Sequence, residues 1–432
     1  MSHLDRTIAP EVSEYGQLQF PHPIQTDVAT ICGGMVRIMS FNRCPEPVCR
    51  VTVAWPVGLM DCDRLSVAAI ASAALKEGTL THDASEISTL LESNGAWLAV
   101  ETLQEYTLLH LYALNRRLRP VLEILQDIIV NPIFPEQRIE ALRLRQAESA
   151  RQNKCKVSYM ADYALRRLMT GKDHLRSRML IAEDIEAVEN SDLNDYWQNL
   201  TSTYAPTVWI AGNITDSVMN TVMSFASALP VKNNSKKAVE PKPIYKPEQV
   251  TSVVTKIKDV KQAAIAMGMN VPGPSHCDHM LLRMAVTALG GYFGSRLNTN
   301  IREDKGLTYG IGASLRMSSQ GTYLFIQSQA DESFISQVVE ETKNEIRSLW
   351  QNPVSLEEKI AITRNTQSRL AGMLDSPFTT LDYCLAMQQT GVDIDFFNRT
   401  QAALDFTAEE IAKVAERHLN PDKLSVSIAR KA

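Results

Sequence analysis

Four adjacent residues, His276-Cys277-Asp278-His279, carry side chains of the types that bind transition metals in proteins. They follow a Pro-Gly-Pro-Ser segment and precede an apolar run, which is a typical context for the start of a helix. Because Ser and Asp side chains accept hydrogen bonds from the first free N–H groups of a helix, we expect Ser275 or Asp278 to cap it. The sequence favours this helix start over a metal site.

The other histidines and the cysteines form no recognisable catalytic or metal-binding motif. His82, His110 and His174 are isolated in sequence, and no HExxH occurs. The seven cysteines occur singly, which is typical of reduced thiols. The glycine-rich segment 290–294 lacks the GK[ST] ending of a phosphate loop and follows no strand, so it predicts a break between helices.

Arg302 and Tyr309 are seven positions apart, with a Gly306 turn between them. A guanidinium and a phenol are hydrogen-bond donors that can hold a peptide carbonyl and stabilise negative charge that develops on it. The turn would bring an Arg at a helix end near a Tyr on the following strand. Without further context, such a pair is usually a surface Arg and a strand Tyr.

The elements that would position these residues occur in two similar series. In the first half we predict a strand, two helices, two strands and two helices at 51–58, 64–77, 84–93, 96–101, 106–113, 120–130 and from 135 past 153. The second half repeats this order at 263–270, 279–289, 294–303, 307–315, 322–328, 334–350 and from 356 onward. Each half also ends with a helix, a proline and a strand. The repeat predicts a duplicated α/β module.

A linker is predicted between the two modules. Residues 230–249 read PVKNNSKKAVEPKPIYKPEQ, with four prolines, five lysines and almost no apolar residues. Such a segment disfavours helix and has little to bury. We therefore expect an N-terminal half at 1–229 and a C-terminal half at 250–432.

Composition excludes several classes of protein. A formal net charge of −5 argues against a nucleic-acid-binding surface, and no apolar run approaches the ~18 residues of a membrane span. The N-terminus lacks a basic start followed by an apolar core. We expect a cytoplasmic protein with neither nucleic acid nor membrane as partner, unless a targeting segment has been removed.

Residues 289–313 read LGGYFGSRLNTNIREDKGLTYGIGA. The glycine pair, Ser-Arg-Leu, Ile-Arg-Glu, Gly-Leu and Tyr resemble the second-half signature of the pitrilysin/insulinase metallopeptidases, which include the mitochondrial processing peptidases and respiratory-complex core proteins. The resemblance covers the chain from about Asp27 to Ile428. It implies an α+β fold with two homologous halves, each a mostly antiparallel sheet covered by helices, that form a clamshell.

The resemblance also locates a lost zinc site. Active members carry HxxEH on their first long helix, where two His at i and i+4 hold Zn²⁺ and the Glu activates water. Here Ala69 and Ala73 stand at the His positions and Ser72 at that of the Glu, in a register set by the following Gly78-Thr79. We expect these positions to be degenerate, with no catalytic residue and no metal in this chain alone.

Glu148 lies 75 residues after Ala73, about where the family carries its third zinc ligand. One carboxylate does not retain a catalytic zinc ion. We therefore interpret Glu148 as a solvated helix residue.

The second half, in contrast, keeps the Arg and Tyr that in this family bind the substrate peptide opposite the zinc ion. The resemblance implies the non-zinc subunit of a two-chain peptidase, inactive alone. Arg302 and Tyr309 would bind short or unfolded peptides, and zinc would be held by a homologous partner that carries HxxEH.

The alternative is a structural or peptide-binding homodimer of the same fold without catalytic activity. A purely structural role would not require Arg302 and Tyr309. An active zinc peptidase would require ligands that the sequence does not supply.

Overall fold

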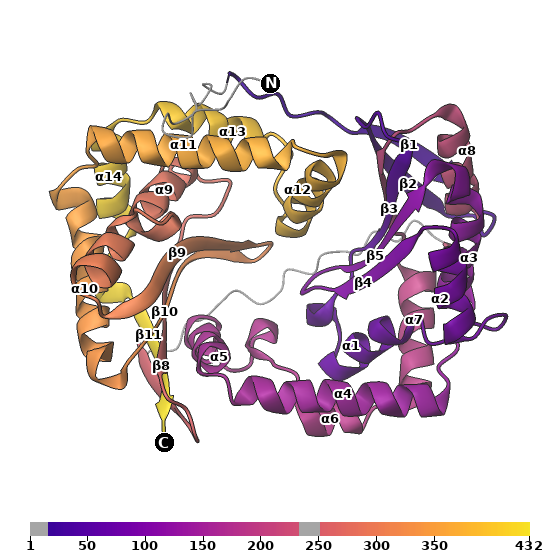
Figure 1. Ribbon diagram of the computed structural model, residues 1–432, viewed down its shortest axis with the longest axis horizontal. Helices are drawn as coiled ribbons and strands as arrows, with labels where there is room; N and C mark the ends of the chain where they lie inside the picture. Colours follow the sequence, from indigo (N-terminus) through magenta and orange to yellow (C-terminus); the bar gives the residue numbers. More distant parts are fainter. Residues whose placement is uncertain (1–15, 233–250) are drawn as a thin grey trace, which may run out of the picture.

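The computed structural model describes residues 16–232 and 251–432. Two β-sheets stand on opposite sides of the molecule, one from each half of the chain, with most helices on their outer faces (Figure 1). The predicted α+β fold of two similar halves is confirmed. No helix within the described ranges is both long and apolar enough to span a membrane.

The bounds of the elements are as follows. The first sheet comprises β1 (Ile24–Ala29), β2 (Met35–Asn42), β3 (Val48–Trp55), β4 (Trp97–Thr102), β5 (Thr107–Leu114) and β6 (Thr207–Gly212). The second comprises β7 (Ser252–Ile257), β8 (Ala263–Val271), β9 (Thr308–Ser318), β10 (Gly321–Ala330) and β11 (Ser425–Lys431). The helices of the first half are α1 (Leu65–Ala74), α2 (Ala84–Ser93), α3 (Leu118–Val130), α4 (Glu136–Lys154), α5 (Val157–Thr170), α6 (Ala182–Glu186), α7 (Asn190–Thr203) and α8 (Asp216–Ser227). Those of the second half are α9 (His279–Val286), the π-helical segments η4 (Thr287–Gly291) and η5 (Asn298–Asp304), α10 (Ile335–Gln351), α11 (Leu356–Met373), α12 (Pro377–Thr390), α13 (Phe396–Ala402) and α14 (Ala408–His418).

The two sheets share one topology. Strands β2-β6-β3-β5-β4 of the first sheet correspond in order to β7-β11-β8-β10-β9 of the second, and the first sheet adds β1 at one edge. In each sheet the first pair of this series is parallel and the others are antiparallel. The two halves therefore repeat the order of their elements, as predicted, and also the way in which their strands pair.

Alternate residues of the central strands build the outer core of each half. Val51 and Val53 of β3 pack with Ile70 of α1 in the first core. Ile265 of β8 and Leu282 of α9 pack in the second. The side chains in between point to the inner face of each sheet, because successive residues of a strand alternate sides.

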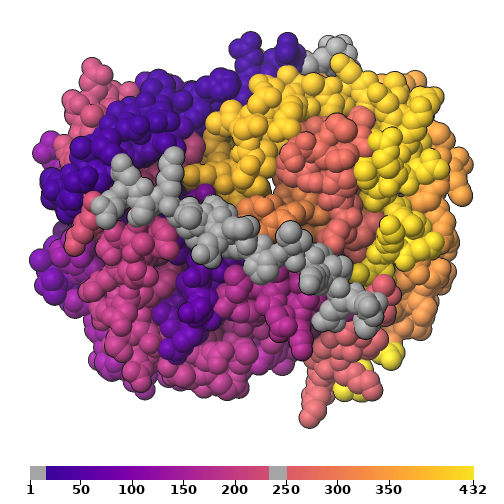
Figure 2. Space-filling view, turned by 180° about the vertical axis from the view of Figure 1, so that it is seen from behind, coloured from indigo at the N-terminus to yellow at the C-terminus, as the bar shows by residue number. Residues whose placement is uncertain are grey.

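The inner faces are covered by helices exchanged between the halves. Helix α5 belongs to the first half, but its Ala161 and Leu165 pack on Ala264 and Ala266 of β8 in the second sheet. Reciprocally, α12 and α13 pack on Trp209 and neighbouring residues of the first sheet. The halves consequently touch above and below the centre of the molecule (Figures 1 and 2).

A buried arginine fixes α12 to the first sheet. The Arg50 side chain on β3 is 2% exposed and forms an ion pair of 2.7 Å with Asp382 of α12. Its guanidinium also donates to the Phe378 carbonyl and to the Tyr112 hydroxyl. Removing the more exposed Asp382 carboxylate would be costly, because the buried charge of Arg50 would stay desolvated without its ionic partner.

The predicted linker lies outside the described residues apart from its first three. Of these, Val231 is buried in the first core, and its carbonyl accepts a hydrogen bond from the Thr30 hydroxyl at 2.7 Å. The boundaries proposed for the two halves stay a prediction.

Candidate functional site

Helix α1 offers no ligand to a metal ion. Ala69 and Ala73 present methyl groups, and both are half-buried. Ser72 is buried, and its hydroxyl has no hydrogen-bond partner among the described residues. Zinc in proteins takes nitrogen, sulfur or oxygen ligands, so this helix does not fit the catalytic zinc ion of active family members.

Glu148 makes the contacts of a surface residue. Its side chain on α4 is 58% exposed and lies 3.9 Å from the Arg151 guanidinium. Its other oxygen accepts a hydrogen bond of 3.2 Å from Gln152. These contacts are typical of a solvated helix position.

The isolated histidines have local structural roles. His82 lies 3.4 Å from the Asp127 carboxylate, and His174 accepts a hydrogen bond from the backbone N–H of Arg176. His279 is buried at the start of α9, with its ring against Phe396.

The prediction that a side chain caps the start of α9 is wrong. Asp278 is the N-cap residue, but its side chain makes no cap hydrogen bond. Its carboxylate instead accepts hydrogen bonds from Arg417 and His418 at the end of α14. Both of these hydrogen bonds go to Oδ2, so the Asp278 side chain is directed toward the end of α14.

Arg302 and Tyr309 lie on either side of a tight turn, as expected. Arg302 belongs to η5, and Tyr309 is the second residue of β9. Gly306 between them has φ of +62°, a conformation that L side chains rarely adopt. The turn thus depends on glycine and sets where the strand begins.

Both side chains have free hydrogen-bond donors. The Arg302 guanidinium stacks over the exposed Phe293 ring, 4.4 Å from its centroid, and has no hydrogen-bond or ion-pair partner in the described part of the chain. Tyr309 is 89% exposed, and its hydroxyl likewise has no partner among the described residues. The two side chains do not bond to each other, so both can serve a ligand.

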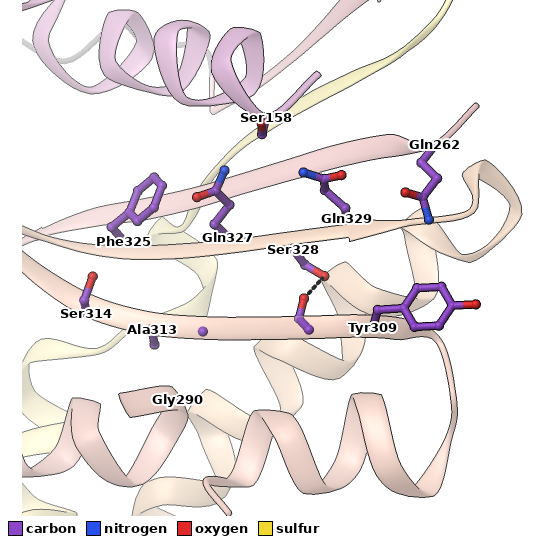
Figure 3. A pocket seen from close by; sticks show the side chains of 12 residues that line it. Ser158, Gln262, Gly290, Tyr309, Ala313, Ser314, Phe325, Gln327, Ser328 and Gln329 are labelled. Carbon is purple, nitrogen blue, oxygen red and sulfur yellow. Dashed lines mark hydrogen bonds between the residues drawn. The ribbon is translucent and has the colours of Figure 1, made fainter. Parts of the chain in front are cut away.

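Tyr309 stands at the rim of an open pocket of about 750 Å³. The floor is the inner face of β9 and β10, and Ser158 of α5 lies on the opposite side (Figure 3). Gln327 and Gln329 point from β10 toward this space. Because amides both donate and accept, they suit the backbone of a polypeptide.

Sequence reasoning missed these glutamines. Gln327 and Gln329 are two positions apart on a predicted strand and therefore share one face, which was the available signal. Gln262 and Ser158 of the same pocket carry no such signal, because other segments bring them there.

Buried hydroxyl groups hold the start of β9 in place. The Thr308 hydroxyl donates to the Gln329 carbonyl at 2.6 Å. The Ser328 hydroxyl donates to the Gly310 carbonyl at 3.1 Å (Figure 3). They lie at an irregularity in the β9–β10 pairing near Ser328. This anchoring fixes the backbone on both sides of Tyr309.

A glycine lets the preceding helix approach the same strand. The backbone at Gly290 leaves helical geometry, which confirms the predicted break between helices. A Cβ at this position would lie 2.6 Å from the backbone nitrogen of Ala313 in β9. The pocket floor thus rests on a contact that only glycine permits.

A second cavity, of about 360 Å³, lies on the inner face of the first sheet beside α12. Arg50, Glu101 and His110 are among its lining residues. Burial lowers the pKa of His110 from the ordinary value of 6.5 to about 4, and the nearby Arg50 acts in the same direction. The Nδ1 atom of His110 lies 2.9 Å from the Thr52 hydroxyl.

Stability should therefore depend on His110 at mildly acidic pH. The unfolded chain takes up a proton below its pKa of 6.5, but the fold disfavours that proton until about pH 4. The free energy of unfolding should thus fall between about pH 6.5 and 4, by on the order of 2–3 kcal/mol. Urea denaturation of the wild type and His110→Gln across this range measures the effect, and equal pH slopes would contradict it.

The chain has the two repeated halves of a metallopeptidase built from two such modules, and these halves exchange helices. Its first long helix has no zinc ligands. A family model described as "Insulinase (Peptidase family M16)" matches residues 67–180, and one described as "Peptidase M16 inactive domain" matches residues 187–364. The chain belongs to the insulinase family of peptidases and peptidase homologues, as the resemblance implied.

Relatives in this family differ in the activity that their names give. The "Uncharacterized zinc protease YmxG" of Bacillus subtilis is 23% identical over 299 residues, which is 69% of this chain and 71% of that protein. The "Non-peptidase homolog YmxG" of Helicobacter pylori is 24% identical over 256 residues, which is 59% of this chain and 58% of that protein.

Solved structures share the fold. The peptidase M16 inactive domain from Pseudomonas fluorescens has a TM-score of 0.82 at 18% identity, with 94% of this chain and 98% of that chain covered. The periplasmic protease PqqL from Escherichia coli has a TM-score of 0.77 at 14% identity. That match covers 99% of this chain but only 49% of PqqL, so this chain spans about half of that protease.

Proposed function

We propose that this chain is the non-zinc subunit of a two-chain peptidase of the insulinase family. It binds short or unfolded peptides in the pocket on β9 and β10, and a homologous partner with HxxEH supplies the zinc ion. The observation that carries this proposal is the contrast between α1, which has no ligand, and the free donors of Arg302 and Tyr309.

The chemistry of each residue follows from its place. The partner's zinc ion and Glu would activate the attacking water. As water attacks a peptide carbonyl, negative charge grows on its oxygen, and Arg302 and Tyr309 donate hydrogen bonds to it. Donors placed in advance where charge develops are often a large contribution to catalysis.

The pocket supports a peptide as the ligand. Its Gln side chains carry no charge, so they can bond a polypeptide backbone without selecting a charged side chain. Strand β9 is at the edge of its sheet and offers unpaired backbone groups to an extended peptide. Such a site favours short or unfolded substrates.

The match to half of PqqL supports the need for a second chain, since this fold accounts for about half of that protease. The experiment is to co-express this chain with a homologue from the same genome that carries HxxEH, and to assay quenched fluorescent peptides. We expect turnover by the complex and none by either chain alone. Replacing the Glu of the partner's HxxEH by Gln should abolish that turnover.

Hydrolysis by this chain alone would contradict the proposal. The second candidate function is a peptide-binding homodimer without catalytic activity, which the name of the Helicobacter pylori relative favours. Sedimentation of the purified chain as a dimer, with no association with the HxxEH homologue, would select that alternative.

A further inference from the structure

Four donor side chains from two distant segments meet where α9 begins and α14 ends. His276, Cys277 and Asp278 directly precede α9, and His418 is the last residue of α14. One ligand atom each from His276, Asp278 and His418 lie within 4.8 Å of one another. In the described part of the chain, no other group of three or more potential ligands comes this close together.

Cys277 adds a fourth donor. Its sulfur lies 3.7 Å from Oδ1 of Asp278 and 3.9 Å from Nδ1 of His276. Around a tetrahedral zinc ion with bonds of about 2.0–2.3 Å, neighbouring ligand atoms are separated by roughly 3.3–3.8 Å. These two separations are close to the required ones. Cys277 is not in the group of three whose ligand atoms lie within 4.8 Å of one another, so its side chain must rotate for the sulfur to join the other donors.

The four side chains differ in how exposed they are, and this difference suits metal binding. Asp278 and His418 are the fixed pair, with side chains 13% and 14% exposed and His418 Nε2 2.7 Å from Asp278 Oδ2. His276 and Cys277 are exposed, so small rotations bring their donors inward. His276 Nδ1 would give up the 3.1 Å hydrogen bond that it accepts from the Asp278 backbone N–H.

The two carboxylate oxygens of Asp278 have different neighbours. Arg417 bonds to Oδ2, whereas Oδ1 faces Cys277. The Arg417 side chain is 59% exposed, so it can keep or release its oxygen while Oδ1 binds the ion.

We propose that His276, Cys277, Asp278 and His418 bind one transition-metal ion of the zinc class, which joins the end of α14 to the start of α9. Two imidazoles, a thiolate and a carboxylate form a donor set that zinc accepts. Binding releases the Cys277 proton. It also breaks the hydrogen bond from His418 Nε2 to Asp278 Oδ2, and the proton of the neutral His418 ring then lies on Nδ1. Four protein ligands leave no position for substrate, so the ion is structural.

This site is separate from the proposed peptidase function and does not depend on it. The ligands of the catalytic zinc ion would lie in a partner, and α1 supplies none. Any zinc that the isolated chain binds should therefore be lost with His418, whatever the outcome of the peptidase assay.

The test uses the full chain without a histidine tag, freed of metal by chelation and titrated with Zn²⁺ against a competing indicator. We expect one equivalent bound by the wild type and at least tenfold weaker binding by His418→Gln, whose amide can still donate to Asp278. The matched control is His82→Gln, because His82 also pairs with an Asp but is in no group of three ligands. It should bind zinc like the wild type.

Two further measurements keep the test independent of folding. Co²⁺ should give a thiolate charge-transfer band that Cys277→Ser removes, and His276→Ala should also weaken binding. Both residues are exposed, so these substitutions leave the core intact. The proposal would be overturned if the wild type bound no zinc at about 10 μM Zn²⁺. It would also be overturned if His418→Gln and His276→Ala both bound zinc as tightly as the wild type. A Co²⁺ complex without the charge-transfer band would overturn the role of Cys277.

Discussion

Replacing Arg302 by alanine and Tyr309 by phenylalanine together should lower kcat/KM of the assembled peptidase by about 10²–10³-fold. Both side chains have donors without partners in the described structure, and the proposed function directs them at the oxygen of the scissile carbonyl. Loss of donors that act mainly in the transition state lowers kcat more than it raises KM. Steady-state kinetics on a quenched peptide measures both constants.

This double variant should fold normally. Tyr309 is almost fully exposed, and Arg302 contacts the exposed Phe293 ring, so neither residue supports the core. The matched control combines Arg347→Ala in α10 and Tyr204→Phe after α7, which replace residues outside the segment 302–309 and the pocket and should leave kcat/KM within about twofold. Full activity in the Arg302/Tyr309 double variant would remove the catalytic role of this pair.

Replacing Gly290 by alanine should destabilise the second half by about 1–3 kcal/mol or more. The new Cβ would lie 2.6 Å from the Ala313 nitrogen and 2.7 Å from its Cβ, so η4 and β9 must move apart. The backbone of Ala313 cannot move away from the new Cβ as easily as the end of a flexible side chain could. Chemical denaturation followed by circular dichroism measures the loss.

The matched control is Gly372→Ala in α11. Among residues 16–232 and 251–432, no atom outside the adjacent residues and nearby backbone of the same helix lies within 4 Å of a Cβ built there, and alanine is a better helix former than glycine. This variant should be as stable as the wild type or gain up to about 1 kcal/mol. If Gly290→Ala has the same stability as Gly372→Ala, the close contact with β9 does not limit the fold.

Local patterns in the sequence predicted individual elements closely. Helix α2 occupies the predicted range 84–93, because Asp83 and Glu86 form a capping box that fixes its start. The short apolar run that is typical of a buried strand likewise placed β5 within one residue of its predicted range. The prediction of degenerate zinc-ligand positions at Ala69 and Ala73 depends in the same way on residue identity within one helix, and it stays a prediction.

Contacts between distant segments could not be read in this way. Arg50 and Asp382 are 332 positions apart, and no periodicity links them. His418 joins Asp278 across 140 positions, so the sequence showed only one side of that cluster. The helix expected at 294–303 corresponds largely to the π-helical segment η5, which spans Asn298–Asp304.

The exchange of α5 and α12 has a mechanical consequence. A helix from the opposite half packs on each sheet, and the residues in these contacts are apolar and buried. Interfaces of that kind resist relative motion. The chain should therefore move as one rigid half-shell, and the hinge that admits a peptide should lie between two such shells. In the proposed two-chain peptidase, substrate entry would then depend on motion of one subunit relative to the other and not on motion within this chain.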